Sequence, residues 1–313
     1  MLLAACLTRE APTRAGGGLL AAAQPAASGQ ATPAAPAEPP PAATYVGSQV
    51  CQACHQQQFA AFAETLMGKI FLKNARSPAE GQGCEVCHGP GSAHLAAGGG
   101  KGVGIIAFRK DSPQPVAEQN AVCLKCHEKG LRLYWKGSPH EGRGLACTNC
   151  HRVMANVSEK SQFVKETEME TCFQCHLQRR AQLQRSSHMP YREGKMTCTN
   201  CHNPHGTATP KQLIENSVNE NCYKCHAEKR GPFLWDHAPV RENCLTCHEP
   251  HGSNHDKLLR VARPRLCQRC HVESGHPGTP QLSTSRFVFN RSCQNCHSQI
   301  HGSNHPSGVR FQR

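Results

Sequence analysis

The 313-residue sequence has few of the side chains from which a protein of this length usually builds its core. Aromatic residues make up only 5% of the chain, and no apolar periodicity is sustained along it. A chain of this size normally buries a large apolar core, so some other material has to fill the interior. No run is long and apolar enough to predict a membrane-spanning helix.

Acidic residues are also scarce, with 22 Asp and Glu against 35 Lys and Arg, which gives a formal net charge of +13. A basic surplus of this size can indicate binding to nucleic acid or to an anionic membrane. The chain has no long basic run, however, and basic residues are not interleaved with aromatic ones. We therefore do not expect it to bind nucleic acid.

Cysteine and histidine are abundant instead, with 21 and 20 residues. All cysteines except Cys6 fall into ten Cys-x-x-Cys-His motifs, the attachment signature of c-type haem, in which two thioether bonds hold the porphyrin and the histidine is the proximal iron ligand. Neither zinc sites nor disulfides would require a histidine after every second cysteine. The sequence therefore predicts ten covalently bound haem c groups. The predicted attachment cysteines are Cys51, Cys54, Cys84, Cys87, Cys123, Cys126, Cys147, Cys150, Cys172, Cys175, Cys198, Cys201, Cys222, Cys225, Cys244, Cys247, Cys267, Cys270, Cys293 and Cys296.

The histidine count matches the number of axial positions on ten irons. Ten histidines belong to the motifs, and ten others lie outside them. The predicted proximal ligands are His55, His88, His127, His151, His176, His202, His226, His248, His271 and His297. The predicted distal ligands are His94, His140, His188, His205, His237, His251, His255, His276, His301 and His305. This balance predicts ligation of every iron by two histidines.

Irons with two protein ligands have no open position for a substrate, so we expect an electron carrier with no catalytic residues. The alternative enzyme is a multihaem reductase of nitrogen or sulfur oxyanions, which needs an open iron and nearby acid–base groups. A filament-forming cytochrome is the alternative structural role.

Met67 lies roughly where later parts of the chain have a histidine upstream of a motif. Because methionine also ligates haem iron, His/Met ligation of one haem is an alternative to simple packing of this side chain.

The ten motifs form five couples, hereafter units 1 to 5, with a period near 50 residues. The units begin at Cys51, Cys123, Cys172, Cys222 and Cys267. Such repetition predicts an elongated, haem-packed array of two-haem repeats in which each unit touches its neighbours. We expect a mostly irregular chain with short α-helices and little or no strand. Helices are expected at about 52–66, 173–185 and 211–217, and the only strand-like run is 286–290.

Three candidate distal histidines lie very close to a motif. His205, His251 and His301 follow a proximal histidine by three or four residues. Three residues span at most about 10 Å, whereas proximal and distal ligands lie on opposite faces of one porphyrin. We therefore expect each of these histidines to ligate the iron of a neighbouring haem, which would bring two haems into near contact.

The N-terminal part differs in composition from the rest. Residues 1–8 are interpreted as a truncated signal region, because Leu3-Ala4-Ala5-Cys6 matches the end of a bacterial lipoprotein signal. Residues 9–44 are rich in alanine and proline and predict a disordered tether, and residues 45–313 are the decahaem domain. Since haem c is attached outside the cytoplasm, we expect export to the periplasm, with Cys6 as a candidate lipid anchor.

The haem-bearing part resembles the decahaem MtrA/DmsE family. The resemblance covers about residues 45–313 and is carried by the ten motifs, by Cys-His-Gly-Pro-Gly-Ser-Ala-His ending at His94, and by the run from Cys293 to Gly308. It implies a periplasmic protein, associated with the outer membrane, that conducts electrons inside a β-barrel porin. It also implies exchange with an extracellular cytochrome, reductase or metal on one side and a periplasmic or inner-membrane cytochrome on the other.

Overall fold

A computed structural model describes residues 42–188, 191, 193–272 and 292–312. Residues Ala43–Arg313 form one compact unit. The predicted signal region, the tether up to residue 41, the strand-like run at 286–290 and His276 lie outside the described residues.

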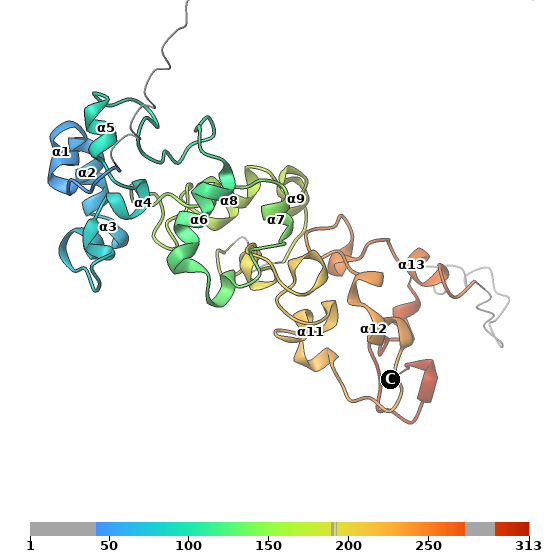
Figure 1. Ribbon diagram of the computed structural model, residues 1–313. Coiled ribbons are helices and arrows are strands. Elements are labelled where there is room, and N and C mark those ends of the chain that lie inside the picture. Colours follow the sequence, from blue (N-terminus) through green and yellow to red (C-terminus); the bar gives the residue numbers. More distant parts are fainter. Residues whose placement is uncertain (1–41, 189–190, 192, 273–291, 313) are drawn as a thin grey trace, which may run out of the picture. The chain divides into compact units, whose positions relative to one another are not determined.

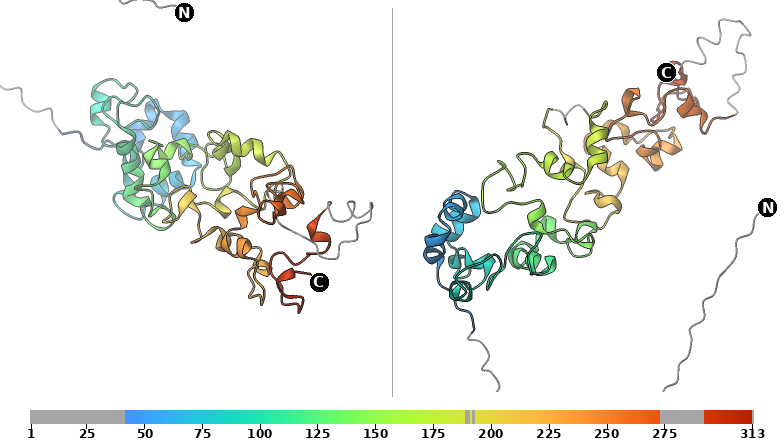
Figure 2. Two further views of the ribbon diagram at one scale, coloured as in Figure 1. Left: turned by 90° about the vertical axis from the view of Figure 1, so that its right-hand side faces the viewer. Right: turned by 90° about the horizontal axis from the view of Figure 1, so that it is seen from above.

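Short helices joined by long irregular segments make up the fold, as Figures 1 and 2 show. Within the described ranges there is no strand, and backbone pairing outside helices and turns is limited to five isolated bridges. This confirms the predicted fold class. The α-helices are α1 (Ser48–Cys54), α2 (Gln56–Ala63), α3 (Leu66–Lys73), α4 (Glu85–His88), α5 (Ser92–Ala96), α6 (Val116–His127), α7 (Pro139–Gly142), α8 (Glu168–Phe173), α9 (Leu177–Leu183), α11 (Val218–Tyr223), α12 (Ala238–Glu242) and α13 (Arg265–Gln268). The 3₁₀ turns are η1 (Glu80–Gln82), η2 (Gly130–Arg132), η3 (Cys147–Asn149), η4 (Cys198–Asn200), η5 (Pro210–Gln212), η6 (Ala227–Lys229), η7 (Cys244–Thr246), η8 (Asp256–Leu258), η9 (Cys293–Asn295) and η10 (Gly308–Arg310).

The expected helices agree with the structure in part. The one expected at 52–66 is split between α1, α2 and the start of α3, and the one at 173–185 between the end of α8 and α9. The helix expected at 211–217 is wrong, because only the single turn η5 occurs there and Lys211 has a φ of 59°. The segment instead bonds back to the preceding motif, with Ile214 N donating to the carbonyl oxygen of Cys201 at 3.1 Å.

Few apolar side chains are buried. In the described part of the chain the buried hydrophobic residues are Phe62, Trp135, Ala146, Phe173, Leu183 and Leu259. Large apolar side chains such as Leu131 and Leu234 are exposed. The polypeptide alone therefore does not bury its apolar side chains as a globular domain of this size does.

Several buried polar side chains anchor loops in place of an apolar core. Glu85 is 3% exposed and accepts hydrogen bonds from the backbone N–H groups of Val46, Gly47 and Gly91 at 2.7–3.2 Å. A buried carboxylate is stable only when it is compensated in this way. Among the residues that the structure describes, no helix is both long enough and apolar enough to span a membrane.

Candidate functional site

Each Cys-x-x-Cys-His motif lies on a single helical turn. The backbone N–H of the motif histidine donates to the carbonyl oxygen of the first cysteine, as in His55, His151 and His202, each at 2.9 Å. Residues four apart lie on the same side of such a turn. Both cysteines and the histidine of a motif are thereby presented together, as attachment to one porphyrin edge and ligation of its iron require.

The two motifs of a unit lie next to each other through their first cysteines. In all five units the two first thiols lie close enough for one to shift the pKa of the other. In unit 2, for example, the Cys123 thiol and the burial of Cys147 itself raise the pKa of Cys147. A polar side chain three residues before the first cysteine joins the motifs in three units. The backbone N–H of Cys84 donates to Ser48 Oγ at 3.1 Å, that of Cys147 to Asn120 Oδ1 at 2.8 Å and that of Cys244 to Asn219 Oδ1 at 2.8 Å.

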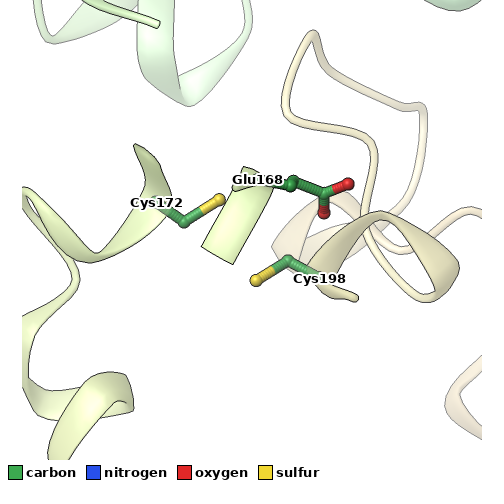
Figure 3. Close-up of side chains that lie close together, drawn as sticks. All are labelled: Glu168, Cys172 and Cys198. Carbon is green, nitrogen blue, oxygen red and sulfur yellow. The ribbon is translucent and has the colours of Figure 1, made fainter. Parts of the chain in front are cut away.

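In unit 3 the residue three before the first cysteine is Met169, and a carboxylate one position earlier, that of Glu168, lies between the motifs, as Figure 3 shows. The Glu168 carboxylate and the Cys172 and Cys198 sulfurs lie within 4.8 Å of one another. Glu168 accepts from the backbone N–H of Thr199 at 2.9 Å and from its hydroxyl at 2.8 Å. Because both sulfurs belong to attachment motifs and the carboxylate already joins them, we assign no metal ion to this cluster.

Consecutive units are also adjacent through their motif cysteines. Burial, followed by the charges of Cys123 and Cys126 in unit 2, raises the pKa of Cys87 in unit 1 to about 11. The same juxtaposition recurs between Cys150 and Cys172 and between Cys247 and Cys270. The motifs therefore follow one another in space in the order in which they follow one another in the sequence.

Seven histidine pairs each combine one predicted proximal ligand with one predicted distal ligand. Their ring centroids are 6.0–6.5 Å apart. Two metal–nitrogen bonds of about 2 Å each, plus roughly 1 Å from each nitrogen to its ring centre, give a separation of about 6 Å. The spacing thus fits one iron between the two imidazoles. The pairs are His55–His94, His140–His176, His151–His205, His188–His226, His202–His251, His237–His271 and His248–His301.

Six of these pairs cross from one unit to the next, and they follow two rules. In the first, a histidine upstream of a unit's second motif reaches the first motif of the next unit, as in His140–His176, His188–His226 and His237–His271. In the second, the histidine just after a second motif reaches the second motif of the previous unit, as in His151–His205, His202–His251 and His248–His301. Consecutive units are therefore interlocked in both directions.

The second ring nitrogen of many of these histidines is held by a backbone carbonyl. Among the proximal rings, His151 Nδ1 bonds the oxygen of Ser161 at 2.8 Å, and His202 Nδ1 bonds that of Lys211 at 2.9 Å. Among the distal rings, His140 Nδ1 bonds the oxygen of Pro204 at 2.7 Å. A neutral ring that donates from Nδ1 keeps Nε2 as the metal-binding atom.

Burial keeps two distal histidines neutral, as iron ligation requires. Removal from solvent, followed by the charges of His151 and Arg132, lowers the pKa of His205 to about 4. Burial, followed by the charge of Lys229, lowers the pKa of His301 to about 4. An imidazole that stays neutral at physiological pH does not have to lose a proton before it binds a metal.

Not every predicted ligand is brought to a partner. Among the described residues, no second imidazole lies against His88 or His127, and His88 instead packs on the Phe108 ring at 5.4 Å. The structure also pairs neither His255 nor His305 with a proximal histidine in its described part, and His305 Nδ1 accepts from the backbone N–H of Ser307 at 3.1 Å.

One residue at the position of a ligand was not predicted. Met154 lies three residues after His151, just as His205 lies three residues after His202. The signal was present in the sequence, because the three-residue offset recurs between His248 and His251. A search restricted to histidine does not detect it.

Comparison with known proteins agrees with this arrangement. A family described as "Doubled CXXCH motif" matches residues 188–231 and 237–276, and one described as "Cytochrome c-type protein NrfB-like" matches residues 84–175. The multiheme cytochrome MtrA of Shewanella baltica is 43% identical over 85% of this chain and 81% of its own length. The cytochrome c-type protein NrfB of Escherichia coli O6:H1 is 26% identical over 42% of this chain and 65% of its own length.

Proposed function

Because the chain belongs to the family of multihaem cytochromes that includes MtrA, we propose that it conducts electrons across the outer membrane through ten haem c groups. It binds haem c covalently and is an electron carrier rather than an enzyme. Beyond this, we propose that the haems number ten, that they form one unbroken row, and that they act at the outer membrane.

The observation that carries the proposal is the interlocking of the histidine pairs. Every pair that crosses between units ties a haem of one unit to a side chain of a neighbouring unit, so that neighbouring haems share a stretch of polypeptide. His205, for example, is three residues from His202 and faces His151 at 6.0 Å. Haems linked through so few residues lie close together, as successive electron transfer requires. The bound groups supply the redox chemistry, and the chain fixes their order and spacing.

The ligand set of the array follows from the same pairs. We assign each of the seven pairs to one iron, which gives seven haems with two histidine ligands. The twenty motif cysteines supply the thioether bonds of all ten haems. A protein ligand on both sides of an iron leaves no position for a substrate, which suits a conductor.

A β-barrel porin of the outer membrane is the proposed partner. A polar chain with many irregular backbone segments cannot lie exposed in hydrocarbon, whereas a closed barrel can enclose it. We propose that the protein works from the periplasm, where haem c is found. It would exchange electrons with a periplasmic or inner-membrane cytochrome on one side and with an extracellular cytochrome, reductase or metal on the other. Lipid attachment at Cys6 would add an anchor.

Reconstitution tests this proposal. The holoprotein and a candidate β-barrel porin from the same organism would be incorporated together into liposomes that contain a trapped redox dye. We expect an external reductant to reduce the dye only when both proteins are present. The barrel alone is the control. Dye that stays oxidised with a fully haem-loaded complex would contradict the proposed conduction.

The reductase alternative makes an opposite spectroscopic prediction. Low-temperature EPR of the oxidised holoprotein should show low-spin signals that nitrite leaves unchanged. A substantial high-spin signal that shifts on addition of nitrite would favour an enzyme with an open iron.

A further inference from the structure

We propose that Met67 and Met154 are axial iron ligands, Met67 for the haem of His127 and Met154 for the haem of His88. The first contact between units would then hold two His/Met haems, where the later three contacts hold haems with two histidines. The inference rests on the proposed function for the presence of the haems. It replaces the expectation that every iron has two histidine ligands.

The backbone around Met154 has the same hydrogen-bond pattern as the backbone around the downstream histidines, which are those that follow the second motif of a unit. In units 2, 3 and 4 the proximal histidine forms an isolated bridge with an apolar residue 11 or 12 positions later, in the pairs His151–Phe163, His202–Leu213 and His248–Leu259. Their Nδ1 atoms bond carbonyl oxygens 9 or 10 residues later at 2.8–2.9 Å. Met154 follows its proximal histidine by three residues, as His205 and His251 follow theirs, so it corresponds to them in this shared backbone pattern. Since those two face the second motif of the previous unit, Met154 is directed toward the motif of His88.

The backbone around Met67 has the same capping pattern as the backbone around an upstream histidine, that is, one that precedes the second motif of a unit. Met67 is the second residue of α3, whose capping residue Thr65 accepts a hydrogen bond from Gly68 N at 3.0 Å. His140 is likewise the second residue of α7, whose capping residue Ser138 accepts from Glu141 N at 3.1 Å. Both capping residues are buried.

The equivalence extends to the residues before these caps. The backbone N–H of Thr65 donates to the carbonyl oxygen of Phe62, and that of Ser138 to that of Trp135, both at 2.9 Å. Phe62 and Trp135 are both among the few buried apolar residues. Met67 therefore occupies the position from which His140 reaches His176, so that it is directed toward the first motif of unit 2, which contains His127.

The contacts between units support both assignments. Between units 3 and 4 and between units 4 and 5, the residue two positions after the downstream histidine bonds the chain two positions before the upstream histidine. Ser253 N donates to the oxygen of Ser186 at 2.8 Å, and Ser303 and Trp235 exchange two backbone hydrogen bonds at 3.0 Å. In the first contact, Asn156 Nδ2 donates to the oxygen of Glu64 at 3.0 Å. Asn156 follows Met154 by two residues, and Glu64 precedes Met67 by three.

The two rules then assign a ligand to the irons of His88 and His127, against which no second imidazole lies in the described part of the chain. Applied one unit earlier, the second rule assigns Met154 to the iron of His88, and the first rule assigns Met67 to the iron of His127. His255 and His305 stand outside both rules. His255 lines a small cavity with Gln182 and Arg260 in units 3 and 4, and His305 is exposed in unit 5.

Methionine in place of histidine as an iron ligand has a definite chemical consequence. A thioether in place of an imidazole raises the reduction potential of a haem. Methionine also cannot donate the hydrogen bond by which His140 Nδ1 contacts the oxygen of Pro204. The affected haems are consecutive, because Cys87 and Cys123 are neighbours. They would form a pair near the N-terminal end of the array that takes up electrons first on reduction.

Spectroscopy of the intact holoprotein tests the proposal. Mass spectrometry first establishes the number of attached haems. Near-infrared magnetic circular dichroism of the oxidised protein then separates His/Met from bis-His haems. We expect two His/Met haems among ten. Met67→His and Met154→His should each remove one of the two, and Met196→Leu, a matched control at a described methionine, should remove none.

Redox titration gives a second readout. In the wild-type protein, two haems should be reduced before the other eight, and each Met→His variant should return one haem to the potential range of the majority. Ten attached haems with no His/Met signal would overturn this inference and leave the proposed conduction intact. Fewer than ten haems would instead count against the proposed function.

Discussion

The contact between units 1 and 2 and the three later contacts use the same backbone scheme with different side chains. In the later contacts, histidines such as His205 and His251 reach across, and each is followed by a glycine with a positive φ. In the first contact the corresponding residues are Met154 and Ala155. The scheme that positions the ligand is thus separable from the identity of the ligand, so that one repeat can hold haems of different potential without a change of fold.

In the later contacts, the backbones of the two units also approach each other more closely. A Cβ atom at Gly206 would overlap the carbonyl oxygen of Tyr134, and one at Gly252 would overlap that of Gln182. Ala155 has no positive φ, and the polar contact in its neighbourhood is made by a side chain, Asn156, rather than by backbone. The first contact therefore depends less on close backbone approach than the later ones.

Exchange of the ligands should have the largest effect. His140→Met together with His205→Met would give the contact between units 2 and 3 the ligands of the first contact. Because methionine raises the potential, we expect two further haems to be reduced early and two further His/Met signals to appear. The single variant His205→Ala should instead open the iron of His151 and convert one haem of ten to high spin by EPR. A loss confined to the haem of Cys198 would refute the pairing across units.

Glycine exchange should separate the contacts by stability. Gly252→Ala forces a Cβ against Gln182 at a φ of 134°, which should lower the free energy of unfolding by about 1–3 kcal/mol. Ala155→Gly is the matched change in the first contact and should cost about 1 kcal/mol or less. Denaturant titrations of the two holoproteins, followed by far-UV circular dichroism, measure the difference. Equal losses would mean that the contacts are equally close.

Removal of an asparagine side chain compares the stability of the same contacts a second time. Asn203 is buried, and its Nδ2 donates to the oxygens of Leu131 at 2.7 Å and Gly206 at 2.9 Å. Asn203→Ala should cost about 1–3 kcal/mol because the buried oxygen of Gly206 and the part-buried oxygen of Leu131 lose their donor. Asn156 is exposed and makes one such bond, so Asn156→Ala should cost about 1 kcal/mol or less. The same titrations compare them, and a larger loss for Asn156→Ala would contradict the ranking.

The motif spacing predicted much of this arrangement. The fold class follows from Cys-x-x-Cys-His, because that motif dictates local geometry, and the attachment of haem at each motif stays a prediction. The short interval between His202 and His205 also predicted a ligand for a neighbouring haem, and the structure places His205 beside His151.

Other features could not be obtained in this way. A count of histidines treats His255 and His305 as equivalent to His251, because composition carries no information on which rings face each other. The helix expected at 211–217 failed because tertiary backbone bonds to Cys201 outweigh local propensity. The count also misses Met154, although its offset from His151 matches those of His205 and His251.

The most direct test is an experimental structure of the holoprotein that identifies the two axial ligands of each iron. We predict that His205 shares an iron with His151, that Met154 shares one with His88, and that Met67 shares one with His127. A structure in which each iron takes both ligands from its own unit, or in which His255 and His305 ligate the irons of His88 and His127, would contradict this account.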